Sequence, residues 1–316
     1  MTSAAVQLKD HLQQELGRVA FGVNDTIHAL TLALIGRGHL LLEGPPGLGK
    51  TLLGRHFAQL LGGSFSRIQG TADLMPSDIT GVHVYSSASS SFVFQPGPLF
   101  ADVILVDEIN RAGPKTQSAL LEAMEERQVS VDRETMVLSD NFLVIATQNP
   151  REFEGTYALP ESQLDRFMIS SRLPYPARAD ELRILDAYNL PDARVRSAPT
   201  PLEHVPEGLI VLARSELASV HVSEALMGYV LDLAVATRNS SRIGLGVSTR
   251  GALALATAAR IEAALRGGGH VLPDDVKRVA PWVLRHRLIL SPDAILDGIN
   301  AQDEVDRLLN QVPVPR

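Results

Sequence analysis

The segment His39–Thr51, HLLLEGPPGLGKT, constrains the fold of this chain more than any other stretch. Its apolar start predicts a short buried strand over His39–Leu42, and the spacing of apolar residues over Lys50–Leu61 predicts a helix. Between them, the residues from Gly44 to Thr51 fit the pattern G-x-x-x-x-G-K-[ST], which binds phosphate when a strand precedes it and a helix follows. The segment therefore predicts an α/β domain with a nucleotide site at one end of its sheet.

The chemistry of this loop follows from its residue types. Glycines let the backbone turn its N–H groups toward phosphate oxygens, and the helix that follows adds the positive end of its dipole. We expect Lys50 to reach the β- and γ-phosphates and the Thr51 hydroxyl to bind Mg²⁺. The alternative is a Gly/Pro turn followed by a chance Lys-Thr pair, which the small number of lysines in the chain disfavours. The predicted nucleotide-binding residues are Gly44, Pro45, Pro46, Gly47, Leu48, Gly49, Lys50, Thr51 and Leu52.

Two carboxylates follow a second apolar run, Val103–Val106, which predicts a central strand of a parallel sheet. In phosphate-loop enzymes an acid at this place helps to hold Mg²⁺, and Asp107 fits that role. A carboxylate near the γ-phosphate can act as a general base, and Glu108 fits that role. A solvated strand end is the alternative, but the alternating order of strands and helices favours the catalytic interpretation.

A third apolar run, Phe142–Thr147, predicts a neighbouring strand that ends in Gln148-Asn149-Pro150. Ligands bind at the carboxyl ends of parallel strands, so Asn149 is a candidate contact for the γ-phosphate or its attacking water. An Asn-Pro pair is equally a turn signal. From spacing alone the two interpretations remain open.

The chain changes character near residue 190, where a proline-rich stretch with little periodicity begins. We expect residues 1–190 to form an α/β core with three αβα layers and a parallel sheet, 191–206 a linker, and 207–316 an all-α lid domain with a C-terminal tail. Only helices are expected after the linker. Alternating residues predict β-hairpins inserted in the core at about 81–97 and 129–138.

The composition of the 316-residue chain excludes several classes of protein. A net charge of −7 does not support nucleic-acid binding driven by bulk charge. The absence of cysteine excludes disulfides and thiolate metal sites. The N-terminus lacks a basic segment followed by an apolar one, and no uncharged apolar stretch reaches the ~18 residues of a membrane span. We therefore expect a cytoplasmic protein with no membrane span.

These motifs together resemble the MoxR family of AAA+ ATPases, in the clade with a helix-2 insert. The resemblance covers nearly all of residues 19–190 and extends more weakly into the helical tail. It implies Mg²⁺-dependent hydrolysis of ATP, a ring of identical subunits that is expected to be a hexamer, and chaperone-like remodelling of a client protein. A partner with a von Willebrand factor A (VWA) domain is also implied. The most specific segments are LLEGPPGLGKTLL (41–53), DLMPSDITG (73–81), FQPGPLFADVILVDEINRAGPKTQSALLEAMEERQVSVD (94–132) and FLVIATQNPREFEGTYALPESQLDRFM (142–168).

The resemblance also implies roles that spacing does not assign. Asn149 is similar to the sensor-1 residue, and Arg166 is similar to the arginine finger that acts in trans on a neighbouring subunit's site. Arg250 is similar to the sensor-2 arginine of the helical lid. The family usually has Val-Gly-Gln before the second helix, where this chain has Phe21-Gly22-Val23.

The two predicted hairpins resemble the helix-2 insert and the pre-sensor-1 hairpin, which face the central pore of the ring. Their aromatic residues Tyr85, Phe92 and Phe94 contact substrate there or pack the hairpin against its own domain, and the sequence leaves both open. A nucleic-acid motor is the first rival function, because replicative helicases share these inserts, and the acidic net charge weighs against it. An ATP-gated scaffold is the second rival, and the presence of Glu108 and Arg166 weighs against it.

Overall fold

The computed structural model describes residues 3–45, 47–132, 134–148, 156–188 and 202–315. Its central feature is a five-stranded, all-parallel sheet in the order β2-β5-β8-β1-β9. The predicted α/β core with a parallel sheet is confirmed. The five strands are β1 (Leu40–Glu43), β2 (Phe65–Gln69), β5 (Val103–Asp107), β8 (Leu143–Gln148) and β9 (Ile169–Arg172).

Alternate residues of the central strands enter two separate apolar clusters, one on each face of the sheet. On β5, Val103 and Leu105 pack in the cluster that contains α2 and α3, whereas Ile104 and Val106 pack in the cluster that contains α5. This alternation, with a period of two residues, buries both faces and produces the three layers. The helices of this part of the chain are α1 (Ala4–Gly17), α2 (Asn24–Ile35), α3 (Lys50–Leu60), α4 (Pro76–Thr80), α5 (Pro114–Glu126), α6 (Glu161–Leu164) and α7 (Arg178–Tyr188), with 3-10 turns η1 (Pro98–Phe100) and η2 (Ile109–Arg111).

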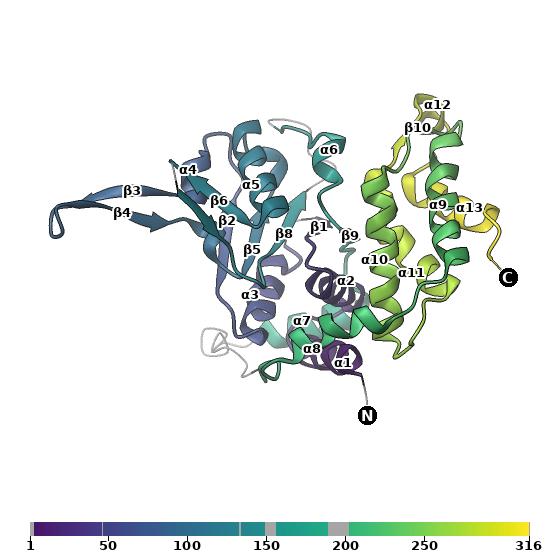
Figure 1. Cartoon of the computed structure of the whole chain (residues 1–316), viewed down its shortest axis with the longest axis horizontal. Coiled ribbons are helices and arrows are strands. Elements are labelled where there is room, and N and C mark those ends of the chain that lie inside the picture. Colours follow the sequence, from purple (N-terminus) through teal and green to yellow (C-terminus); the bar gives the residue numbers. More distant parts are fainter. Residues whose placement is uncertain (1–2, 46, 133, 149–155, 189–201, 316) are drawn as a thin grey trace.

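The strand β9 is absent from the predictions made from sequence. It pairs with β1 at the edge of the sheet, with Leu40 opposite Ile169. Its sequence, ISSR, is short and mostly polar, so it lacks the apolar run that marks β5 and β8. Its serines are buried all the same, because the lid covers this edge (Figure 1).

Two antiparallel hairpins extend the core. The first pairs β3 (Gly81–Ser86) with β4 (Ser91–Pro96) and projects far from the sheet, on the side opposite the lid (Figure 1). The second pairs β6 (Gln128–Val131) with β7 (Glu134–Val137). A hydrogen bond of 2.9 Å between His83 Nδ1 and Asp132 Oδ2 joins the two hairpins.

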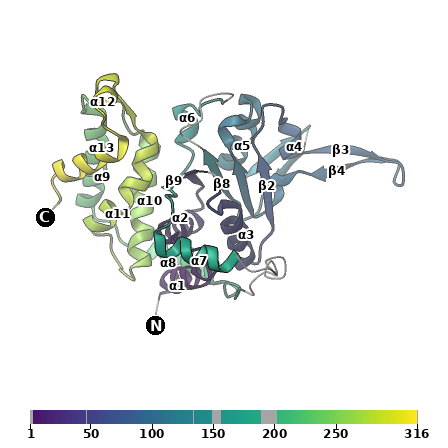
Figure 2. The same ribbon diagram turned by 180° about the vertical axis from the view of Figure 1, so that it is seen from behind.

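The lid is helical, and it stacks against the β9 side of the sheet (Figures 1 and 2). The expectation that only helices follow the linker is wrong in one respect, because Ile243 and Leu290 pair in a two-stranded antiparallel sheet. Local periodicity does not reveal such short strands that lie so far apart in the sequence. The elements are α8 (Leu209–Glu216), η3 (Leu217–Ser219), α9 (Glu224–Asn239), β10 (Ile243–Leu245), α10 (Thr249–Leu265), α11 (Pro273–Leu284), η4 (Arg285–Arg287), β11 (Ile289–Leu290), α12 (Pro292–Leu296) and α13 (Ala301–Gln311).

The helix α8 lies beside α1 rather than among the other lid helices (Figures 1 and 2). The carboxylate of Glu216 accepts hydrogen bonds from the backbone N–H groups of Ala4 and Ala5, so it caps the first turn of α1. Most of the predicted linker lies outside the described residues, but Val205 N donates to Leu60 O at 2.7 Å. Among the helices that the structure describes, none is both long enough and apolar enough to cross a bilayer.

Candidate active site

The predicted phosphate loop leads from β1 into α3. Gly47 and Gly49 have φ values of +83° and +74°, the left-handed region that favours glycine, and Gly49 immediately precedes the first helical residue, Lys50. The Lys50 ammonium donates to Gly44 O at 2.6 Å and closes the loop. Pro46, one of the predicted binding residues, lies outside the described part of the chain.

Lys50 occupies a partly desolvated position between the loop and two carboxylates. Burial lowers the pKa of Lys50 below its usual value, and the negative charges of Asp107 and Glu108 oppose this shift. A half-buried cation near the N-terminus of a helix is the arrangement that stabilises bound phosphate groups.

A cavity of about 500 Å³ connects this loop to the carboxyl ends of β2, β5 and β8. The structure thus places Lys50 and Thr51 of the predicted phosphate loop in one cavity with Asp107 and Glu108. The polar side chains that line the cavity are Lys50, Thr51, Arg67, Gln69, Asp107, Glu108 and Thr147.

Asp107 is held by two side chains from neighbouring strands. Arg67 Nη2 lies 2.7 Å from Asp107 Oδ2, and the Thr147 hydroxyl donates to Asp107 Oδ1 at 2.7 Å. Arg67 was not among the residues predicted from the sequence. The signal was the polar end of β2, because Gln69 lies opposite Asp107 in a parallel register.

Glu108 adopts a left-handed backbone conformation, with φ of +55°, at the point where β5 ends. Its backbone N–H donates to the Thr147 hydroxyl at 3.0 Å, and its carboxylate lies 3.1 Å from Arg111 Nε. Gly70 passes so close that an added Cβ would lie 2.1 Å from Glu108 O. These contacts over-determine a costly backbone conformation and hold the Glu108 side chain at the cavity wall.

The donors in this cavity suit a magnesium ion. Mg²⁺ prefers hard oxygen ligands, and Thr51 and Asp107 present a hydroxyl and a carboxylate to the same space.

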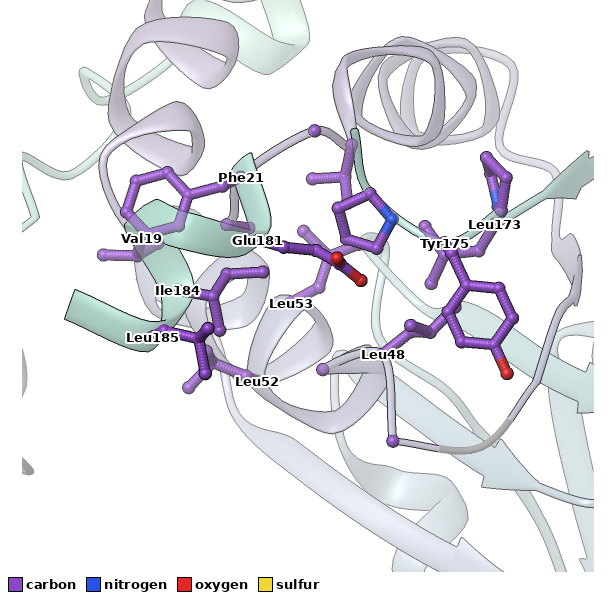
Figure 3. A pocket seen from close by; sticks show the side chains of 17 residues that line it. Val19, Phe21, Leu48, Leu52, Leu53, Leu173, Tyr175, Glu181, Ile184 and Leu185 are labelled. Carbon is purple, nitrogen blue, oxygen red and sulfur yellow. The ribbon is translucent and has the colours of Figure 1, made fainter. Parts of the chain in front are cut away.

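A second cavity, of about 690 Å³, lies on the other side of the phosphate loop (Figure 3). Its lining is mostly apolar and comes from residues 19–23, the loop, residues 173–176 and α7. Glu181 is the one charged side chain among the described residues that line it, and Figure 3 shows its carboxylate directed into the cavity. The volume and lining suit a purine base beside the phosphate site. Of this lining, the sequence had predicted Gly47, Leu48, Gly49 and Leu52 as nucleotide-binding residues.

Arg166 and Arg250 both pair with the carboxylate of Glu125 and lie away from the phosphate loop of their own chain. Arg166 Nε lies 3.0 Å from one carboxylate oxygen of Glu125, and Arg250 Nη2 pairs with the other oxygen. Among the described residues, neither arginine lines the phosphate cavity or the base cavity. Glu125 was not predicted, and only the tertiary structure reveals its double pairing. Asn149 lies outside the described residues, so its predicted role remains a prediction.

The aromatic residues of the first hairpin divide into two groups. Phe94 packs within its own domain, because its ring centroid lies 5.5 Å from that of Phe100. Tyr85 and Phe92 contact each other near the projecting end, where 57% and 70% of their surfaces are exposed.

Comparisons with known proteins agree with this geometry. Residues 39–169 match the model of the "ATPase family associated with various cellular activities (AAA)", and residues 235–308 match the "AAA lid domain". The chain is 43% identical to the uncharacterized protein YeaC of Bacillus subtilis, over 96% of this chain and 93% of that protein. It is 39% identical to the chaperone MoxR1 of Mycobacterium tuberculosis, over 96% of this chain and 81% of that protein.

A third relative, the protein MoxR of Paracoccus denitrificans, is 34% identical over 95% of this chain and 94% of its own length. A solved structure from Cytophaga hutchinsonii superposes with a TM-score of 0.88 at 36% identity, covering 99% of this chain and 97% of that chain. Phosphate loop, acidic strand end, helical lid and full-length similarity lead to one conclusion: this chain belongs to the MoxR family of AAA+ ATPases and hydrolyses ATP.

Proposed function

We propose that this chain is the subunit of a ring-shaped, ATP-driven chaperone that remodels or matures a client protein. ATP would place its base in the apolar cavity and its phosphates on the loop at Gly44–Thr51. Thr51 and Asp107 would hold Mg²⁺, which supplies charge neutralisation at the phosphates. Glu108 would accept a proton from the attacking water, and Asn149 would orient that water.

The second half of each site would come from the neighbouring subunit. Arg166 would act as the arginine finger, and Arg250, the sensor-2 residue, would act beside it. The observation that carries this proposal is the position of the two arginines. Both pair with Glu125 and lie outside the cavities that contain the phosphate loop. Two guanidinium groups that converge on one carboxylate could also bind a phosphate group, because their charge and spacing are complementary to it.

The assembly that this requires is a closed homo-oligomeric ring, for which we propose a hexamer in the cytoplasm. We further propose three functional segments: a nucleotide-binding core at 1–190, a linker at 191–206, and a lid with a C-terminal tail at 207–316. A partner with a VWA domain would deliver or select the client.

Mixing two inactive variants tests the shared site. Glu108→Gln subunits keep their arginines but lack the general base, and Arg166→Ala subunits keep the base but lack the finger. Each alone should hydrolyse ATP at a small fraction of the natural rate. A mixture should recover hydrolysis, because an intact Glu108 then faces an intact Arg166 across a subunit boundary. An unrestored rate in a mixture that forms mixed rings would refute the shared site.

The first hairpin supports a protein client rather than a nucleic acid. Its exposed Tyr85 and Phe92 offer apolar surface, and His83 at its base lies 2.9 Å from the Asp132 carboxylate and 3.9 Å from that of Glu134. Acidic groups repel a phosphate backbone.

Glu108→Gln rings should retain client on affinity purification, and Tyr85→Ala with Phe92→Ala should lose it while still binding ATP. Hydrolysis that DNA stimulates in a strongly salt-dependent way would favour the nucleic-acid motor instead.

A further inference from the structure

The tripeptide Arg285-His286-Arg287 is buried, although two of its residues carry permanent charge. It forms η4 at the end of α11, and its three residues are 7%, 9% and 7% exposed. Removing a guanidinium group from water costs several kcal/mol unless hydrogen bonds and an opposite charge replace the water. The partners of this tripeptide therefore show what its burial accomplishes.

Arg287 binds the segment that carries the proposed arginine finger. Its Nε lies 2.7 Å from Asp165 Oδ1, and its Nη2 donates to the carbonyl oxygens of Asp165 and Phe167 at 3.1 and 2.8 Å. Nη1 donates to Met168 O at 3.3 Å. These bonds surround Arg166 on both sides, so the backbone that carries Arg166 is fixed to the lid.

The same carboxylate fixes the helix that carries Arg250. The Ser248 hydroxyl donates to Asp165 Oδ2 at 2.6 Å, and Ser248 caps the N-terminus of α10 by accepting from Gly251 N at 3.0 Å. Asp165, which immediately precedes Arg166, is thus bonded to Ser248, which lies two positions before Arg250. The two arginines are held at one relative position.

The other two members of the tripeptide extend this connection toward the phosphate loop. Arg285 Nη2 donates to the Ser170 hydroxyl at 2.9 Å and lies 3.7 Å from Glu43 Oε2, and Glu43 immediately precedes the loop. His286 Nε2 lies 2.9 Å from Phe167 O. Burial lowers the pKa of His286 well below its usual value, so the ring is neutral.

We propose that the tripeptide Arg285-His286-Arg287, with Arg287 acting through Asp165, positions Arg166 and Arg250 as one rigid unit that completes the neighbouring subunit's site. The inference rests on the proposed trans role of the two arginines. These are positioning residues, since none of them lines the phosphate cavity among the residues that the structure describes. Loss of the link between Arg287 and Asp165 therefore impairs hydrolysis in the next subunit and leaves the chain's own catalytic cavity intact.

Adding Arg287→Lys to one member of the mixed pair tests this directly. Lysine keeps the charge but has one nitrogen in place of a fork that reaches four oxygens of residues 165–168. In the Glu108→Gln subunit, which donates the finger, Arg287→Lys should lower the restored hydrolysis rate by about 10-fold to 100-fold, because a misplacement of about 1 Å costs about 10²-fold. In the Arg166→Ala subunit, which accepts the finger, the same substitution should leave the restored rate within about twofold.

Asp165→Asn, introduced in turn into the Glu108→Gln subunit and the Arg166→Ala subunit, provides a second, more conservative variant. It tests the same proposal if Arg287→Lys does not fold. Arg242→Lys, an exposed lid arginine, is the matched control and should have no effect in either subunit. Every variant is first checked for ring assembly and for binding of a fluorescent ATP analogue. Equal losses in donor and acceptor, or no loss in the donor, would overturn the inference. If the parent mixture itself recovers no hydrolysis, the trans assignment fails first, and this inference fails with it.

Discussion

The two regions that carry the predicted catalytic residues are built in opposite ways. Around the phosphate loop, polar side chains from several strands converge on one concave space and hold one another at 2.7 to 3.1 Å. At the other region, Arg166 and Arg250 share Glu125 on an open surface, where 30% and 50% of their side chains are exposed. The first region is organised to enclose a ligand, whereas the second presents its two arginines on the surface, where another molecule can bind them. Under the trans role proposed for Arg166 and Arg250, the difference means that each chain contributes one half-site to each of two different active sites.

The largest effect should come from the open region. Arg166→Ala should lower ATP hydrolysis by roughly 10³–10⁵-fold, because an arginine finger neutralises charge that develops only in the transition state. Binding of ATP to an isolated subunit should change little. Steady-state phosphate release and titration with a fluorescent ATP analogue measure the two quantities, with Arg242→Ala as the control. A tenfold loss of binding by the isolated subunit would place Arg166 in its own site and erase the contrast.

Glu108→Gln attacks the enclosed region and should lower the turnover rate by about 10²–10⁴-fold, the contribution of a general base. ATP affinity should stay within about threefold, since glutamine has nearly the same shape. Single-turnover hydrolysis and equilibrium binding test this pair of outcomes. Glu122→Gln on the exposed face of α5 is the matched control. Unchanged turnover would reassign the base.

Acid should weaken both regions together, because His39 joins β8, which carries Thr147 of the cavity, to α5, which carries Glu125. Buried His39 accepts from Val144 N on β8 and lies 3.0 Å from Met124 O on α5. Burial lowers the pKa of His39 to about 4 from 6.5. Between these values the unfolded chain binds a proton that the native chain does not, so stability is complete above pH 6.5 and falls toward pH 4.

The expected loss from His39 is about 2 kcal/mol between pH 7.5 and pH 5. Urea unfolding at the two pH values measures it. His39→Gln should remove this part of the pH dependence, while His270→Gln, at an exposed position, should leave it unchanged. The same pH dependence in the His39→Gln variant would contradict this account.

The smallest effect should come from a substitution in the apolar cavity of about 690 Å³ beside the phosphate loop, which belongs to the enclosed region alone. Ile184→Ala removes apolar surface from the cavity wall and should weaken ATP binding by about tenfold, or about 1.4 kcal/mol. Turnover at saturating ATP should remain near the natural value. Leu182→Ala, on the same helix but outside the cavity lining, is the control. Equal losses of affinity in both variants would mean that α7 acts through its fold rather than through the cavity.

The enclosed region was largely predictable because its signals are local. A strand, a glycine-rich turn and a helix follow one another within a few residues, and apolar runs mark β5 and β8 directly. Arg67 and Gln69 were not predicted, because their importance depends on which strand lies beside β5. The edge strand β9 and the small lid sheet escaped because short strands acquire their identity from distant partners.

The sequence by itself determined the loop, the acidic strand end, the strands β1, β5 and β8, and the family. Only the tertiary structure decided where the arginines lie. Arg166 and Arg250 are 84 positions apart in the chain, and Asp165 and Arg287 connect them through contacts that no local pattern encodes. The physical reason is that a buried charge takes its partners from whatever the packing of two domains brings within about 3 Å.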